Sequence, residues 1–128
     1  MSNPVIYHIL PVPVWEALQG KAEYRAPSLE SEGFIHASAS LEQVLWVANR
    51  IYRQEPRLVV LSVDRSRIKS PVKDEMARDG AGPFPHVYGP VNLDALVEAR
   101  GLARSEGRWV GWGEPLSPPG KGSEIARG

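Results

Sequence analysis

Short β-type segments, each stopped by proline or glycine, surround one long amphipathic helix, and this pattern most constrains the fold. Val5–Leu10 and Leu58–Val63 are apolar and rich in β-branched residues, which is typical of buried strands. A helix is predicted from Ser40 to about Arg53, opened by a capping-box spacing between Ser40 and Gln43. Its expected apolar face consists of Leu41, Val44, Leu45, Ala48, Ile51 and Tyr52. We therefore expect an α+β chain in which this helix builds much of the core.

The rest of the chain is predicted to form shorter elements. A short helix is expected at Pro13–Gly20, strands at Phe34–Ser38 and Pro85–Tyr88, and a short edge segment at Ile68–Met76. Ala95–Leu102 fits a helix or a strand, and a strand is favoured. Loops are expected at Lys21–Gly33 and Ala77–Phe84, and Trp15 and Trp46 are expected in the core. We expect one domain over residues 1–113 and a disordered tail over residues 114–128, where proline, glycine and serine dominate.

The composition excludes several classes of protein. Fifteen basic residues balance fifteen acidic ones among 128, so overall charge does not support binding to nucleic acid or membranes. The chain has no cysteine, which rules out disulfides, thiolate metal sites and cysteine nucleophiles. Pro11 and Pro13 interrupt the apolar N-terminal segment, so we expect no signal peptide or membrane span and a cytoplasmic protein.

Three histidines carry the strongest functional signal. His8, His36 and His86 each lie in a different expected strand among apolar or aromatic neighbours. Because side chains alternate along a strand, Ser38 is expected on the face of His36, and Tyr88 on the face of His86. A buried polar group left without a hydrogen bond costs about 1–3 kcal/mol, so each histidine alone fits a hydrogen-bonded core residue. Together the three histidines favour one inward-facing ligand cleft.

Glu75 is the candidate carboxylate for this cleft. It directly follows a short extended segment and precedes a glycine-containing loop. Two interpretations stay open: a carboxylate at the cleft edge, or a solvated charge beside Lys73 and Arg78. Three imidazoles from three strands would also suit an open zinc site, but no His-x-His or HExxH spacing supports it, and we expect no metal.

Several motifs resemble a known family. They are YHI, SLESEGFIHAS, VANRIY, and FPHVYGP after Glu75. Over residues 5 to about 107 the chain is similar to a small bacterial family, domain of unknown function nine-five-two. That family is grouped with ADP-ribosyltransferases and resembles RNA 2'-phosphotransferases. The resemblance implies a split, strongly curved β-sheet with a few flanking helices and NAD bound, as a substrate, in the cleft.

The resemblance also implies roles for the candidate residues. The expected catalytic residues are Glu75, His86 and His36, and the expected nucleotide-binding residues are His8, His36, Ser38, His86 and Tyr88. The expected function is cleavage of NAD or transfer of its ADP-ribosyl group, which needs a carboxylate near the developing ribose cation. The alternative is a non-catalytic module that binds a nucleotide or metabolite in the same cleft. The acceptor (water, protein, RNA or a small molecule) stays open.

Overall fold

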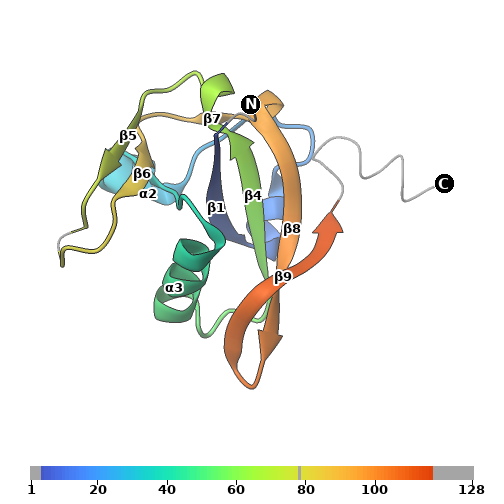
Figure 1. The fold of residues 1–128 in the computed structure, drawn as a ribbon. Helices are drawn as coiled ribbons and strands as arrows, with labels where there is room; N and C mark the ends of the chain where they lie inside the picture. The colour runs from blue at the N-terminus through green and yellow to red at the C-terminus, as the bar shows by residue number, and fades with distance from the viewer. Residues whose placement is uncertain (1–3, 78, 117–128) are drawn as a thin grey trace.

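A four-stranded antiparallel sheet forms the centre of the molecule in the computed structural model, which describes residues 4–77 and 79–116. Its strand order is β1-β4-β8-β9. The strands are β1 (Val5–Pro11), β4 (Leu58–Asp64), β8 (Leu96–Ser105) and β9 (Arg108–Leu116). The pairing of β8 with β9 shifts register twice, and Figure 1 shows these two strands bending strongly as they cross the molecule. The predicted strands at Val5–Leu10 and Leu58–Val63 are thus confirmed.

Two apolar cores lie on opposite faces of this sheet. Alternate residues of β4 supply them: Val59, Leu61 and Val63 belong to one core, and Leu58 and Val60 to the other. All seven residues of β4 are buried, because the strand is central in its sheet and covered on both faces. The continuous apolar run in the sequence therefore has a direct structural cause.

A second, three-stranded sheet carries most of the candidate site. Its order is β3-β6-β5, with β3 at Ile35–His36, β6 at Phe84–Val87 and β5 at Val72–Glu75. Beyond the end of β3, Tyr7 and Ser38 exchange two backbone hydrogen bonds of 2.8 and 2.7 Å, which join this sheet to β1. A separate pair is formed by β2 (Glu23–Tyr24) and β7 (Val91–Asn92).

Helix α3 (Leu41–Ile51) packs against the large sheet, as predicted, and covers the second core. The Ser40 hydroxyl accepts a hydrogen bond from the Gln43 backbone N–H at 3.2 Å, so Ser40 is the N-cap. The Gln43 side chain returns to the backbone N–H of Ala39 at 2.7 Å rather than to that of Ser40. The capping-box prediction is therefore confirmed with a shift of one residue in the second bond.

The remaining helices are short. They are α1 (Val12–Ala17), α2 (Pro27–Ser31) and the 3₁₀ turns η1 (Arg65–Arg67) and η2 (Leu93–Ala95). Within residues 4–77 and 79–116, no helix is both long enough and apolar enough to cross a membrane. The molecule is thus an α+β protein with curved antiparallel sheets and few helices.

Several sequence predictions need correction. The expected loop at Lys21–Gly33 contains β2 and α2, whose short lengths give little periodic signal. Trp46 is 41% exposed and Ile51 is 66% exposed, because the large sheet covers only one stripe of α3. β9 continues to Leu116, so the first three residues of the predicted tail belong to a strand. The rest of that tail, residues 117–128, lies outside the described residues.

Candidate functional site

His8 connects the two sheets through its imidazole ring. It lies on β1, and its Nδ1 is 2.6 Å from the backbone carbonyl of His36 on β3. Since a carbonyl can only accept, Nδ1 carries the proton, and Nε2 accepts a hydrogen bond from the Tyr24 hydroxyl at 2.9 Å. Burial is the main cause that lowers the pKa of His8 to about 4. The ring is therefore neutral near pH 7, and both of its nitrogens are engaged.

His36 and His86 are direct partners across β3 and β6. Their ring centroids are 5.4 Å apart, and the ring planes stand at 78°. The His36 side chain is 53% exposed, and its Nε2 lies 3.2 Å from the Glu32 carboxylate. The prediction that His36 points inward is wrong, because Ile35 and Ala37 on either side of it are buried and alternation turns His36 outward. Ser38 is buried instead, at the junction with Tyr7.

Glu75 on β5 is held by two side chains from β6 and the residue after it. Its Oε1 accepts a hydrogen bond from the Tyr88 hydroxyl at 2.6 Å and another from Nδ1 of His86 at 2.8 Å. These bonds, that of Tyr88 foremost, hold the pKa of the Glu75 carboxyl below its usual value. The same contact with Glu75 raises the pKa of the Tyr88 hydroxyl. Neither bond uses Oε2, so Glu75 presents an ionised, oriented and partly exposed carboxylate.

Phe34 covers this cluster and was not among the predicted site residues. Its ring stacks on that of His86 at 4.1 Å between centroids and 21° between planes. The centroid of the Phe34 ring also lies 4.9 Å from that of the His36 ring and 5.4 Å from that of the Tyr88 ring. Tyr24, which binds His8, was not among the predicted residues either. Phe34 is the first residue of the predicted strand that contains His36, which is a usable signal, whereas Tyr24 lies in a polar segment that gave none.

The structure therefore brings most of the predicted residues into one region. The ring of His8 contacts the backbone of His36, the His36 ring neighbours that of His86, and His86 binds Glu75 together with Tyr88. The interpretation of Glu75 as a merely solvated charge does not fit these contacts. Among the described residues, no group of three histidine, aspartate or glutamate side chains is placed to hold a metal ion, so the geometry gives the zinc alternative no support.

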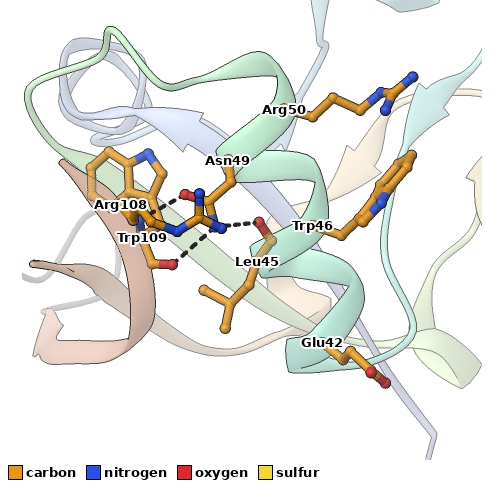
Figure 2. A pocket seen from close by; sticks show the side chains of 7 residues that line it. All are labelled: Glu42, Leu45, Trp46, Asn49, Arg50, Arg108 and Trp109. Carbon is orange, nitrogen blue, oxygen red and sulfur yellow. Dashed lines mark hydrogen bonds between the residues drawn. The ribbon is translucent and has the colours of Figure 1, made fainter. Parts of the chain in front are cut away.

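Two hollows of the described surface lie beside α3, and none of the predicted site residues lines them. The larger, of about 550 Å³, lies between α3 and β9. Figure 2 shows Asn49 at its wall, where the Asn49 side chain exchanges hydrogen bonds of 2.8 and 2.9 Å with the backbone of Trp109. The smaller, of about 230 Å³, lies between α3 and the loop before β6.

Fold and cluster together define a small α+β protein with a histidine–carboxylate site on its second sheet. The chain belongs to the family described as protein of unknown function DUF952, whose profile matches residues 9–99. It is similar to protein CC0527 from Caulobacter crescentus. The crystal structure of CC0527 is 28% identical over 95% of this chain and 98% of that chain, with a TM-score of 0.70. The solution structure of CC0527 is 26% identical over 98% and 99% of the two chains, with a TM-score of 0.66. No curated protein shows significant similarity.

Proposed function

We propose that this chain is a cytoplasmic enzyme that cleaves the nicotinamide–ribose bond of NAD and transfers ADP-ribose, on an ADP-ribosyltransferase-like fold akin to that of RNA 2'-phosphotransferases. The Glu75 carboxylate carries this proposal. Tyr88 and His86 both bind its Oε1. Neither of these bonds uses Oε2, which can therefore face a ligand. An anion fixed in place before the reaction stabilises a developing positive charge without reorganisation.

The reaction assigns a role to each group. The C–N bond between ribose C1' and the nicotinamide ring breaks, and its electron pair leaves with nicotinamide. Positive charge on the ribose is stabilised by Glu75, and the lone pair of the acceptor then forms the new bond to C1'. The exposed ring of His36, 3.2 Å from Glu32, accepts the proton that the acceptor loses. Every bond broken is thus matched by one formed.

We assign positioning roles to the other predicted residues. His8 has both ring nitrogens engaged, so we assign it to fixing the backbone of His36 rather than to contact with the ribose. Ser38 joins the two sheets beside the site. Tyr88 and His86 orient Glu75, and Phe34 stacks on the His86 ring and keeps it in place. These assignments make Glu75 and His36 the residues expected to touch the reacting atoms.

The test is nicotinamide release from NAD, followed by chromatography of the product. Glu75→Gln keeps the size and one acceptor oxygen but removes the charge, and we expect its rate to fall by about 100-fold or more. Glu98→Gln is the matched control, since Glu98 is also a strand glutamate paired with a partner, Arg100 at 3.2 Å. Turnover in Glu75→Gln equal to that of the unaltered protein would overturn the proposal.

A binding module without turnover is the second candidate, and one observation favours it. The side chains of His36 and Glu75 are 53% and 38% exposed, so the cluster offers limited shelter from water. A ligand at 100 times its dissociation constant raises the stability by about 2.7 kcal/mol, which a thermal melt detects. Stabilisation by NAD or ADP-ribose without any nicotinamide release would favour binding alone over catalysis.

A further inference from the structure

The smaller hollow lies beside the candidate site. Phe84 and His86 share one face of β6, because side chains alternate along a strand and Pro85 and Val87 take the other face. Phe84 is the direct partner of Glu75 in the pairing of β5 with β6. Side chains of such pairs have Cβ atoms about 4.5–5.5 Å apart. Phe84, which lines the hollow, is therefore a direct neighbour of Glu75 across the two strands.

Aromatic and small residues line this helix–loop hollow. Its lining consists of Glu42, Gln43, Trp46, Ala81, Gly82 and Phe84. Trp46 is 41% exposed, and its ring lies 5.8 Å from that of Phe84, inclined by 30°. In Figure 2, Trp46 projects from α3 on the side opposite Trp109, and Glu42 lies at the end of the helix. An exposed indole next to a second ring gives a flat apolar wall suited to a planar group.

The loop side of the hollow is fixed to α3. The Gln43 side chain donates a hydrogen bond to the carbonyl of Pro83 at 3.0 Å and accepts one from Ala39 at 2.7 Å. Gly82 has a positive φ of 115°, and a Cβ there would lie 2.9 Å from the backbone N of Phe84. A side chain at position 82 is therefore excluded. Gln43 thus ties the loop side of the hollow to α3.

The electrostatics of the hollow favour a cation. Among the described residues that line it, Glu42 is the one with a charge, and Phe84 is the strand partner of Glu75. The indole of Trp46 already receives a planar cation, because the guanidinium of Arg50 lies 4.8 Å from its centre. Arg50 itself pairs with Asp79 at 3.4 Å, which offsets its charge. Carboxylate and indole together thus select planar groups that carry positive charge.

We infer that the helix–loop hollow is a subsite for a planar organic cation, held against Trp46 and Phe84 and paired with Glu42. This inference rests on the proposed function, because it places that cation next to the carboxylate at which the reaction would occur. Two sources share this chemistry: the pyridinium ring of NAD, and the guanidinium of an acceptor. The neutral nicotinamide released by cleavage would lose the charge attraction and leave.

Nuclear magnetic resonance of the intact chain tests the subsite directly. The indole N–H signal of Trp46, assigned through Trp46→Phe, is followed during titration with 1-methylnicotinamide, methylguanidinium and neutral nicotinamide. We expect at least one of the two cations to shift this signal and to bind at least threefold more tightly than neutral nicotinamide. Glu42→Gln should remove that preference, whereas Glu16→Gln, an exposed glutamate on α1, should leave it unchanged.

Each outcome has one meaning. A response to the pyridinium alone assigns the hollow to the nucleotide, and a response to the guanidinium alone assigns it to the acceptor. No shift with either cation, or equal affinity for neutral nicotinamide, overturns the subsite. NAD cleavage that survives Trp46→Ala with unchanged KM for both substrates also overturns it while leaving the proposed function intact. Cation binding at Trp46 without any NAD cleavage would support the subsite and count against the proposed enzyme.

Discussion

Mild acid should destabilise this protein through His8. The ring donates to the carbonyl of His36, accepts from Tyr24, and has a folded-state pKa of about 4 against 6.5 when unfolded. Between these two values the unfolded chain binds a proton that the folded chain rejects, so stability falls as the pH drops from 6.5 toward 4. Above pH 6.5 His8 is neutral in both states and causes no such loss.

The size of the effect follows from the pKa difference. Lowering the pKa of His8 from 6.5 to about 4 corresponds to roughly 3 kcal/mol of folding free energy for a fully buried ring. Because water reaches part of the ring, we expect a loss of about 1–3 kcal/mol. Asp74 and Glu75 also have lowered pKa values, but their stabilising contributions begin to fade only below their unfolded values of 3.8 and 4.5. The window from pH 6.5 to 5 therefore isolates the imidazole from these carboxyls.

Urea unfolding at several pH values measures this contribution. The comparison is with His8→Asn, whose amide can still donate to the carbonyl of His36 but does not titrate. We expect the stability of the unaltered protein to fall more steeply between pH 6.5 and 5 than that of the variant. Tyr24→Phe is the control, since it removes about 1 kcal/mol of hydrogen bonding but keeps the burial that dominates the pKa. Parallel pH curves for the unaltered protein and His8→Asn would refute the reasoning.

Three further substitutions test the packing. Asn49→Ala removes both side-chain bonds to the backbone of Trp109, so we expect a loss of about 2–4 kcal/mol in urea unfolding; a loss below about 0.5 kcal/mol would contradict this. Gly89→Ala places a Cβ 2.3 Å from the Ser70 hydroxyl, and its melting temperature should drop and partly recover when Ser70→Gly is added. Ser40→Ala should cost about 1 kcal/mol through the lost N-cap, and unchanged thermal unfolding would argue against the cap.

The elements that carry the histidines could be predicted because their apolar runs are bounded by proline and glycine. The side on which His36 lies could not. Alternation separates the two faces of a strand but does not say which one is buried, and here Ile35 and Ala37 take the buried face. The partner of His8 was equally hidden, since Tyr24 lies 16 residues away in a polar segment and reaches the ring through tertiary structure. The Glu75 contacts with His86 and Tyr88 depend on strand register, which the sequence leaves open.

The imidazole of His8 belongs to one sheet, and the carbonyl that it binds belongs to the other. Any rearrangement that parts the sheets must break this bond, let water reach the ring and raise its affinity for protons. The protonation of His8 therefore reports whether the two sheets stay in contact. The ring resonances of His8 would register opening on ligand entry without any added label.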